Sequence, residues 1–563
     1  VPTPPASPSR PRLWSACPRA DKVRPMNSSA RTGRPFRPTR LPPFRPLRRV
    51  AETAFALLLL AACAGLSDPQ EAALAERFEH MTGTAMAEIE TVHLDPPAPE
   101  ALAFAALDGL QRIAPRLTFA QEGEAAVARY LDGRLIASVD LPATESVDLW
   151  ADRLTDLVFA TRAEVPALAA AEEETLYRAF FDGMLSRLDR FSRYAGREDA
   201  REAREEREGF GGIGVRLDSH PDGARVADVE PTKPADAAGL LIGDVLVAID
   251  GEPIGGEPVR RVLEMLRGPI DQPVIVTLRR ERVSDPLTVT VGRTRIVPDT
   301  IVQRRDGAYA VIEISSFSQR TSKRLAEAIA SARAHPDGAP AGIILDLRGN
   351  PGGLLDQAVS SADLFLDHGL ISRADGRHPN SHQRFMAEPG DLAAGLPLAV
   401  LVNGASASAA EILASALQDQ GRAALIGMTS FGKGTIQTVV SLPNDGELYL
   451  TWARFVAPSG YPLQRLGVGP TICTSGARDA VRALDQALRV VPSDGAADPS
   501  SPVARRRLLG PEPDDGAIRE ILAICPWQPH EGADIDLAVA RMLLDSPTLY
   551  DKAIEIARQA PTS

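Results

Sequence analysis

The spacing of hydrophobic residues changes twice along the 563-residue chain. Between residues 66 and about 205, apolar side chains recur every three or four positions, as in "EEETLYRAFFDGMLSRLDRF", which is typical of amphipathic helices. From Gly209 the pattern changes to short alternating segments separated by turns, which indicates strands. From about residue 297, apolar runs such as "AGIILDLRG" alternate with helical segments such as "ASAAEILASALQDQG". The pattern predicts a multidomain α/β protein with a helical N-terminal region.

A chain of this length is too long for one hydrophobic core and is expected to form about three or four domains. The charged segment "EDAREAREERE" before the first change is expected to form a helix with a solvated face. The polar segment "PSDGAADPSSP" follows the α/β region. We place the boundaries as follows: a basic arm with an export signal (1–62), a helical N-terminal domain (63–207), a β-rich domain (208–296), an α/β core (297–474), a linker (475–515) and a helical appendage (516–563).

The first fifty residues carry twelve Lys or Arg residues, one acid and many prolines, a composition that forms no packed core. An Arg-rich end, up to Arg49, is followed by the short apolar run Ala54–Ala62 and by small residues. This order is typical of an export signal. Nine apolar residues are far fewer than the roughly twenty that a spanning helix needs, so we expect no permanent transmembrane span here. The expected location is the bacterial cell envelope, on its periplasmic side.

The end of this signal, "LAAC" (60–63), resembles the lipobox of bacterial lipoproteins. The resemblance implies that Cys63 is lipidated, becomes the mature N-terminus and anchors the protein to a membrane. A plain secretory signal cut near Ala62 is the alternative, in which Cys63 is incidental. Since the chain begins with Val1, Met26 within the basic arm is a second candidate start.

The exported part of the chain is acidic and poor in cysteine. Removing residues 1–62, with twelve basic and two acidic residues, moves the formal charge from −12 to −22. Such a body is a poor nucleic-acid binder, because binding to phosphates needs a basic face. Cys473 and Cys525 either pair in an oxidising compartment or stay as buried thiols. No CxxC or HExxH spacing occurs, so neither a metal nor a cofactor is expected.

The segment "GMTSFGKGT" (427–435) nearly matches a phosphate-binding loop, in which backbone N–H groups hold phosphates and a hydroxyl after the lysine holds magnesium. Here Gly434 takes the place of that hydroxyl. The following "TIQTVVSL" is β-branched and predicts a strand, whereas a phosphate loop opens a helix. A nucleotide site is therefore disfavoured, and a structural Gly-Lys-Gly turn remains the alternative to a catalytic role for Lys433.

A second candidate lies where the strand "LPLAVLVN" turns into an Ala-rich helix and places Ser406 and Ser408 at the junction. Ser408 and Glu411 also match a capping box, which is a purely structural alternative. The helix start supplies unpaired N–H groups and a positive dipole end, which stabilise an oxyanion beside a serine nucleophile. No histidine occurs between His382 and His530, so the available base is Lys433. That lysine needs burial to lower its pKa before a useful fraction is neutral.

Several motifs occur together in one order: "GMLSRLDRFSRY", "GFGGIGV", "DLRGNPGGLL", "NGASASAAEILASALQDQGRAALIG", "SFGKGTIQTV" and "LTWARFVAPSG". With them the chain resembles, over about 175–474, the C-terminal processing (tail-specific) peptidases, which are serine proteases with a Ser/Lys active site. The resemblance implies a protease core of the crotonase/ClpP-like α/β type. It also implies protein or peptide substrates with free C-termini, and it leaves open a homo-oligomer or an activating adaptor.

Carried over by position, the family's functional residues fall on six residues of this chain. The resemblance implies the following roles: Ser408 as nucleophile, Lys433 as base, Gln437 as its support, Asp419 as a further supporting residue, and the N–H groups of Ala409 and Gly352 as the oxyanion hole. The family's "SASASE" is "SASAAE" here. Four residues along a strand span about 13 Å, so Gln437 reaches Lys433 only if the chain turns or folds back. Asp419 is alternatively a surface residue near a helix end.

The β-rich segment resembles a PDZ domain, with a glycine loop, "PADAAGLLIGDVLVAIDG", the helix "VRRVLEMLRG" and two closing strands. In that family the loop N–H groups hold a terminal carboxylate while the peptide adds as a strand. The residues implied here are Gly211, Gly212, Ile213, Gly214 and Val215. An ordinary glycine turn is the alternative. A membrane-tethered PDZ module with a latent peptidase core, and an acyl-thioester enzyme on the same core, are the alternatives for the whole chain.

Overall fold

The computed structural model describes residues 69–489, 501–510, 512–529 and 534–558. The predicted export signal and Cys63 lie outside the described residues. Within these ranges, no helix combines the length and the apolar character that a membrane crossing requires.

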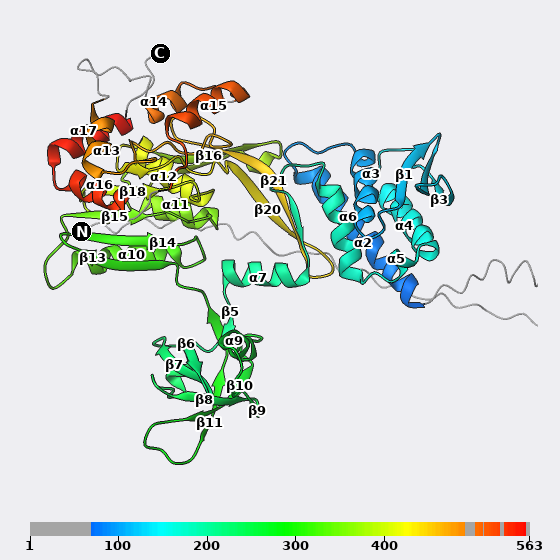
Figure 1. Cartoon of the computed structure of the whole chain (residues 1–563), viewed down its shortest axis with the longest axis horizontal. Helices are drawn as coiled ribbons and strands as arrows, with labels where there is room; N and C mark the ends of the chain where they lie inside the picture. Colours follow the sequence, from blue (N-terminus) through cyan, green and yellow to red (C-terminus); the bar gives the residue numbers. More distant parts are fainter. Residues whose placement is uncertain (1–68, 490–500, 511, 530–533, 559–563) are drawn as a thin grey trace, which may run out of the picture. The chain divides into compact units, whose positions relative to one another are not determined.

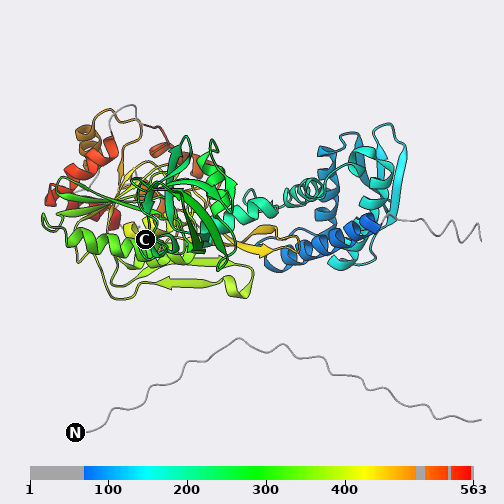
Figure 2. The ribbon, with the colours of Figure 1, turned by 90° about the horizontal axis from the view of Figure 1, so that it is seen from below.

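The N-terminal region contains a group of helices (Figures 1 and 2). Aromatic side chains form part of its core. Phe78 packs against Phe180, with ring centroids 4.7 Å apart, and stacks on Tyr177 at 5.9 Å. A three-stranded antiparallel sheet, which the helical pattern did not predict, is inserted between the helices. The elements are α2 (Pro69–Val92), α3 (Pro99–Gly109), η1 (Leu110–Arg112), β1 (Leu117–Glu122), β2 (Ala125–Tyr130), β3 (Leu135–Asp140), α4 (Val147–Glu164), α5 (Pro166–Ala169), α6 (Glu173–Leu185) and β4 (Arg193–Ala195).

The charged helix α7 (Arg197–Glu208) has the solvated face that its sequence predicts, and Ala200 is its only buried residue. Arg204 and Arg207 donate to the carboxylate of Glu447 at 2.9 and 3.0 Å. The Glu447 side chain is only 2% exposed, and a buried carboxylate is costly without cationic partners. On the same helix, Glu205 accepts from Arg267 at 2.7 Å. Ion pairs therefore fix one side of α7.

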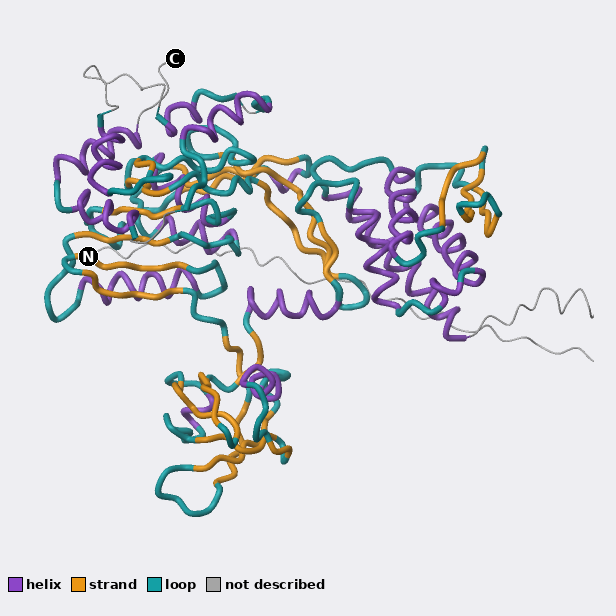
Figure 3. Tube along the Cα trace, in the orientation of Figure 1, coloured by secondary structure: helices purple, strands orange, loops and turns teal. Residues whose placement is uncertain are grey.

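The PDZ-like domain is mainly strand, as Figure 3 shows in orange. Its sheet has the order β11-β10-β8-β7-β6, with β9 paired to β8. Alternate side chains such as Val274, Val276 and Leu278 point into its own core. Strand β6 lies at the edge of this sheet, next to α9. The elements are β5 (Phe210–Gly212), β6 (Val215–His220), β7 (Gly223–Val229), α8 (Pro234–Ala237), β8 (Val245–Ile249), β9 (Glu252–Pro253), α9 (Val259–Leu266), β10 (Pro273–Arg279), β11 (Leu287–Gly292) and β12 (Thr294–Ile296).

The α/β core contains a sheet of order β13-β14-β15-β18-β19-β22, parallel except for β13. Neighbouring positions on each strand face opposite sides, so Leu345 packs in one hydrophobic cluster with α10–α12 and Ile344 in another. The elements are β13 (Ile301–Asp306), β14 (Tyr309–Ile314), α10 (Thr321–Arg333), β15 (Gly342–Asp346), α11 (Leu355–Asp363), β16 (Leu370–Gly376), η2 (Pro379–Ser381), β17 (Gln383–Met386), β18 (Leu398–Val402), α12 (Ala409–Asp419), β19 (Ala424–Gly427), β20 (Thr435–Ser441), β21 (Glu447–Val456) and β22 (Ile472–Cys473).

A second sheet, of order β17-β16-β21-β20 with β4 paired to β21, carries the long hairpin β20–β21. The far end of this hairpin inserts Leu442, Leu448 and Leu450 into the hydrophobic core of the helical N-terminal region. The hairpin therefore belongs to two cores at once, which fixes β20 beside the segment that follows α6.

The linker predicted after the α/β core was wrong. The interval 475–515, predicted as a linker, contains α13 and α14, because Ala483, Leu484 and Leu488 form an apolar stripe that is buried. Together with α16 and α17, α13 covers the second face of the core sheet. A largely parallel sheet needs both faces covered, so these helices complete the fold. The elements are α13 (Ala480–Leu488), α14 (Pro502–Arg507), α15 (Asp515–Ile524), α16 (Ile535–Leu544) and α17 (Pro547–Arg558).

Candidate active site

Ser408 lies in the turn that joins β18 to α12, and its backbone is strained. Its φ of 56° and ψ of −115° are values that non-glycine residues rarely adopt. Gly352 approaches so closely that a Cβ there would lie 2.8 Å from Ser408 Cβ. The neighbouring Ser406 is buried and donates from Oγ to Leu347 O at 2.8 Å. The two serines therefore differ in role: Ser406 closes the turn, whereas Ser408 lines a cleft.

A buried carboxylate joins the serine turn to the lysine loop. Glu411 accepts from Ser408 N at 2.8 Å, from Lys433 N at 2.9 Å and from Gly432 N at 2.7 Å. It also accepts from Ser430 Oγ at 2.5 Å. Burial raises the pKa of Glu411, and these four hydrogen bonds oppose that rise. The sequence pattern marked Glu411 only as a helix cap, yet it links both candidate catalytic residues.

The lysine loop offers no phosphate cradle. The N–H groups of Gly432 and Lys433 donate to Glu411, and Gly434 N donates to Gln464 Oε1 at 2.9 Å. A Cβ on Gly434 would lie 2.1 Å from Gln464 N, so the close approach of two backbones requires glycine there. The loop therefore positions Lys433 rather than presenting free donors to an anion.

The Lys433 side chain points into the same cleft as Ser408. Its Nζ donates to Gln437 Oε1 at 3.1 Å and lies 5.3 Å from the centre of the Phe191 ring. Burial lowers the pKa of Lys433, and the charge of Arg193 lowers it further. Among the described residues, the hydrogen bonds include none between Ser408 Oγ and Lys433 Nζ.

Gln437 contacts Lys433, although four residues of a regular strand would hold the two too far apart. Lys433 precedes β20, in an irregular loop, and the register of β20 against β21 shifts between Ile436 and Gln437. A long lysine side chain can then run back along the chain to the glutamine. Gln437 Nε2 donates in turn to the carbonyl of Phe191, a residue 246 positions away.

The segment after α6 completes the surroundings of the lysine, and sequence reasoning did not single out its residues. Asp189 accepts from Phe191 N at 2.8 Å, from Ser192 Oγ at 2.7 Å and from His93 Nε2 at 3.1 Å. Asp95 N donates to His93 Nδ1, so Nε2 carries the proton. Burial alone would raise the pKa of Asp189, but these hydrogen bonds outweigh it and hold the pKa below its usual range. The network fixes the Phe191 carbonyl that Gln437 uses.

One of the two N–H groups expected in the oxyanion hole, that of Gly352, is not available. Gly352 N donates to Asn350 Oδ1 at 2.8 Å, so this N–H is already used. In the described structure, the N–H groups of Gly353 and Ala409 have no hydrogen-bond partner, and both residues line the cleft with Ser408. The glycine that presents a free donor is therefore Gly353, and Gly352 is needed for its close packing on the serine.

The cleft around Ser408 has a volume of about 590 Å³. Apolar side chains line it: Leu354, Leu355, Ile412, Ile436, Trp452 and Phe455. Charged side chains also line it: Arg190, Arg193, Arg207 and Asp356. Its size and its apolar lining residues suit several residues of an extended polypeptide.

Asp419 lies at the opposite end of α12 from Ser408 and does not line the cleft. It is not a surface residue either, since its side chain is 2% exposed and forms an ion pair with Arg507. It also accepts from the N and Oγ of Ser459, at 2.9 and 2.6 Å. Asp419 therefore anchors the far end of the helix that carries Ser408.

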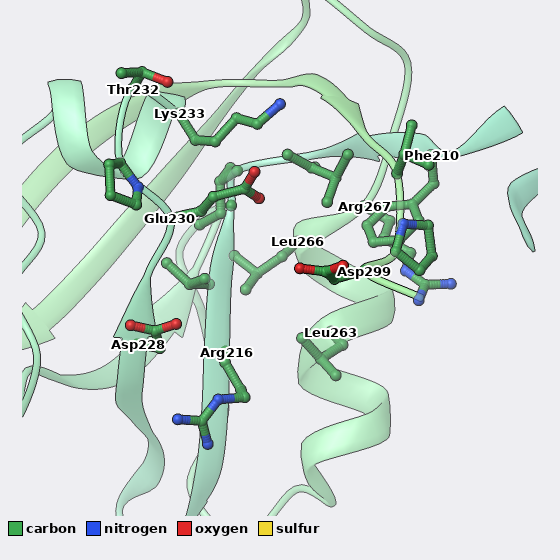
Figure 4. A pocket seen from close by; sticks show the side chains of 18 of the residues that line it. Phe210, Arg216, Asp228, Glu230, Thr232, Lys233, Leu263, Leu266, Arg267 and Asp299 are labelled. Atoms are coloured by element: carbon green, nitrogen blue, oxygen red, sulfur yellow. The ribbon is translucent and has the colours of Figure 1, made fainter. Parts of the chain in front are cut away.

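A second groove, of about 610 Å³, lies between β6 and α9 of the PDZ-like domain (Figure 4). Leu263 and Leu266 of α9 line it, as Figure 4 shows. Four residues from the end of β5 to the start of β6 also line it: Gly212, Ile213, Gly214 and Val215. Gly211 does not line the groove, because it packs on Gly268 O, 2.0 Å from where its Cβ would stand. An edge strand beside a groove lined by both apolar and charged side chains can accept a peptide as an added strand.

Cys473 of β22 and Cys525, which follows α15, form a disulfide. The bond ties the C-terminal helices to the edge of the core sheet. Trp527, two residues further on, packs on Gly404 in the turn that leads to Ser408.

Comparisons with known proteins find similar families and relatives. The model of peptidase family S41 matches residues 308–474, and a PDZ domain model matches residues 225–280. A carboxy-terminal-processing protease of Bartonella bacilliformis is 38% identical over 303 residues, which are 54% of this chain and 70% of that protein. Carboxy-terminal processing protease CtpA of Bacillus subtilis is 34% identical over 47% of this chain and 56% of its own. A solved photosystem II D1 C-terminal processing protease is 27% identical, covering 52% of this chain and 81% of its own, with a TM-score of 0.32.

Proposed function

Because this chain belongs to peptidase family S41, the serine-type carboxy-terminal-processing proteases, and carries a PDZ domain, we propose that it is an endopeptidase that uses Ser408 and Lys433. The observation that carries this proposal is the shared hydrogen bonding of Glu411, which ties the backbone of the strained serine to the backbone of the lysine. Both side chains line one cleft, and the pKa of Lys433 is lowered there.

In the proposed reaction, neutral Lys433 takes the proton of Ser408 Oγ as the oxygen attacks the carbonyl carbon of the scissile bond. Gln437 accepts one N–H of the amine, which leaves the nitrogen lone pair for the serine. The serine and lysine side chains must approach each other for this step, and such contacts often tighten only when substrate binds.

The N–H groups of Ala409 and Gly353 then stabilise the oxyanion of the tetrahedral intermediate. Collapse of the intermediate breaks the peptide bond, and the Lys433 ammonium donates its proton to the leaving amine. Lys433 next deprotonates a water molecule, which hydrolyses the acyl enzyme and restores Ser408. The lysine ammonium returns its proton to Ser408 Oγ as the acyl bond breaks.

We further propose that the PDZ groove captures the free C-terminus of a protein substrate. The edge strand β6 would pair with the last residues of the substrate, and Leu263 and Leu266 would contact apolar side chains. Capture raises the local concentration of the substrate near the cleft.

Export and lipidation at Cys63 are proposals that rest on the sequence alone. Mass spectrometry of the mature N-terminus tests them directly, because a lipidated Cys63 and a cut after Ala62 without lipid give different masses.

The catalytic proposal is tested with Ser408→Ala, assayed on an unfolded protein with an apolar C-terminus. We expect activity to fall by about 10⁴-fold or more, since removal of a nucleophile disables the catalytic unit. Ser406→Ala is the matched control, because Ser406 is buried in the same turn and should retain most activity. Equal cleavage by wild type and Ser408→Ala overturns the proposal. Absence of cleavage by the wild type favours a PDZ binding module with a latent core.

A further inference from the structure

Two arginines that line the active-site cleft have no acidic partner. Arg190 and Arg193 both line the cleft that contains the candidate nucleophile. Across the described part of the chain, neither guanidinium forms an ion pair or a hydrogen bond, whereas Arg207 in the same cleft is paired with Glu447.

Aromatic rings hold both guanidinium groups in place. Cζ of Arg193 lies 3.8 Å from the centre of the Tyr449 ring, and the two residues are paired across β4 and β21. Cζ of Arg190 lies 4.6 Å from the centre of the Phe191 ring and 5.5 Å from that of Phe431. Stacking of this kind orients a guanidinium and leaves its N–H edge available to a planar acceptor.

The cleft is locally basic although the chain is acidic, with a formal charge of −12. Asp356 is the one acid among the described residues that line it, against three arginines and Lys433. Arg207 is neutralised by its own ion pair, so Arg190 and Arg193, which are both exposed, remain as unpaired positive charges in the cleft.

We propose that Arg190 and Arg193 form a carboxylate-recognition site inside the catalytic cleft, which selects substrates that present a carboxylate close to the cleaved bond. The inference rests on the proposed function and adds a substrate class to it. A guanidinium binds a carboxylate through two parallel hydrogen bonds, so the fixed stacking geometry suits this ligand. In a polypeptide the carboxylate is either an Asp or Glu side chain or the free C-terminus.

This site differs from terminal capture by the PDZ groove, where backbone N–H groups bind the ligand. It also lies beside the catalytic base, since Phe191 contacts both Arg190 and Lys433. A carboxylate held there would fix the register of the substrate next to Ser408, which backbone pairing at a distant groove does not do.

The test uses internally quenched peptides of one parent sequence. One pair carries Glu or Gln beside the cleaved bond and ends in an amide, and a second pair ends in a free acid or an amide. For the wild type we expect kcat/KM about tenfold higher for the carboxylate member of at least one pair. Arg190→Gln and Arg193→Gln should each reduce that preference severalfold. Arg187→Gln is the matched control, because Arg187 is an exposed residue of the same segment that does not line the cleft.

The two pairs distinguish the source of the carboxylate. A preference in the Glu/Gln pair that the arginine variants lose identifies an acidic side chain, and one in the acid/amide pair identifies the chain terminus. An acid/amide preference that both arginine variants retain belongs to the PDZ groove and contradicts the inference.

Reaction of Ser408 with peptidyl phosphonates separates failure of the inference from failure of the proposed function. Equal rates with Glu-containing and Gln-containing phosphonates, together with equal cleavage of every pair, overturn the carboxylate site alone. If no phosphonate labels Ser408 and no peptide is cleaved, the Ser/Lys function fails and the inference fails with it.

Discussion

The PDZ groove and the catalytic cleft have similar volumes, about 610 and 590 Å³, but they use charged residues differently. In the PDZ groove, Arg320 pairs with Glu230 and Arg324 with Asp299, so these cations are already satisfied. Lys233 likewise donates to a backbone carbonyl. Such a groove offers a ligand mainly an edge strand and an apolar wall, and it can accept many sequences.

The catalytic cleft instead keeps charges that are not neutralised by partners. Arg190 and Arg193 stack on aromatic rings, and Lys433 has a lowered pKa because burial and Arg193 disfavour its charged form. Arg190 and Arg193 are exposed, so they are available to a ligand, and a pKa shifted by burial like that of Lys433 is typical of functional sites. The comparison suggests that the groove binds main chain whereas the cleft selects and cuts.

Removing the amine of Lys433 is expected to have the largest effect on catalysis in the cleft and no effect on binding in the PDZ groove. We expect Lys433→Met to lower kcat/KM by about 10³-fold, in the range that loss of a general base causes. Peptide binding to the PDZ groove, measured by fluorescence anisotropy, should stay unchanged. Lys433→Arg keeps the positive charge but cannot deprotonate, so it should be equally inactive. Substantial activity in Lys433→Arg would show that the amine is not the base.

Glu411→Gln tests how the cleft is held together. The carboxylate accepts four hydrogen bonds, whereas a carboxamide can accept only on its single oxygen. We expect a loss of about 2–4 kcal/mol in the free energy of unfolding and a fall of about 100-fold in kcat. Denaturant titration and kinetics measure the two effects. The exposed Glu313→Gln is the control, and a Glu411→Gln protein with wild-type stability and kcat would contradict the positioning role.

The corresponding loop of the PDZ groove is held by backbone bonds, so a backbone change tests it. Gly214 has a φ of 83°, and a Cβ there would lie 2.5 Å from Lys233 Cβ. Gly214→Ala should raise KM about tenfold for a protein with a free C-terminus and leave kcat for short amidated peptides nearly unchanged. Gly239→Ala is matched, because Gly239 has a φ of 80° but open space around it. Equal effects of the two substitutions would assign the result to backbone strain alone.

The difference between the PDZ groove and the catalytic cleft also explains which of their features the sequence could predict. Glycine loops and helix caps impose local requirements, so the PDZ segment, the serine turn and the lysine loop were visible as short motifs. The contact between Lys433 and Gln437 was uncertain because a register shift in β20 is not encoded in a spacing rule. Asp189 and His93 were missed because they act through a segment far away in the chain.

The C-terminal helices were also underestimated, for a related reason. Their contribution depends on partners distant in sequence, such as Arg348, which donates to Asp534 at 2.7 Å across 186 positions. Local composition identified the interval 475–515 as a linker, although α13 covers one face of the core sheet together with α16 and α17. The composition of the polar segment beside α13 does not reveal that the helix is buried against a sheet distant in sequence.

The smallest predicted effect is on the pH dependence of kcat/KM. It separates the two roles proposed for Arg193, which are to bind a carboxylate and to lower the pKa of Lys433. Asp189 and Glu411 favour the charged form of Lys433, whereas burial and Arg193 oppose it. Removing the arginine charge should therefore raise the pKa of Lys433. Because the base acts in its neutral form, the acidic limb of kcat/KM should move to higher pH in Arg193→Gln. The shift should occur with neutral and acidic peptides alike.

Arg190→Gln provides the contrast, because Arg190 is not among the groups that shift the pKa of Lys433. It should reduce carboxylate preference without moving the acidic limb, whereas Arg193→Gln should change both. Arg187→Gln should change neither. If Arg193→Gln leaves the limb in place, the charge of Arg193 does not set the pKa of Lys433 and serves only to bind substrate.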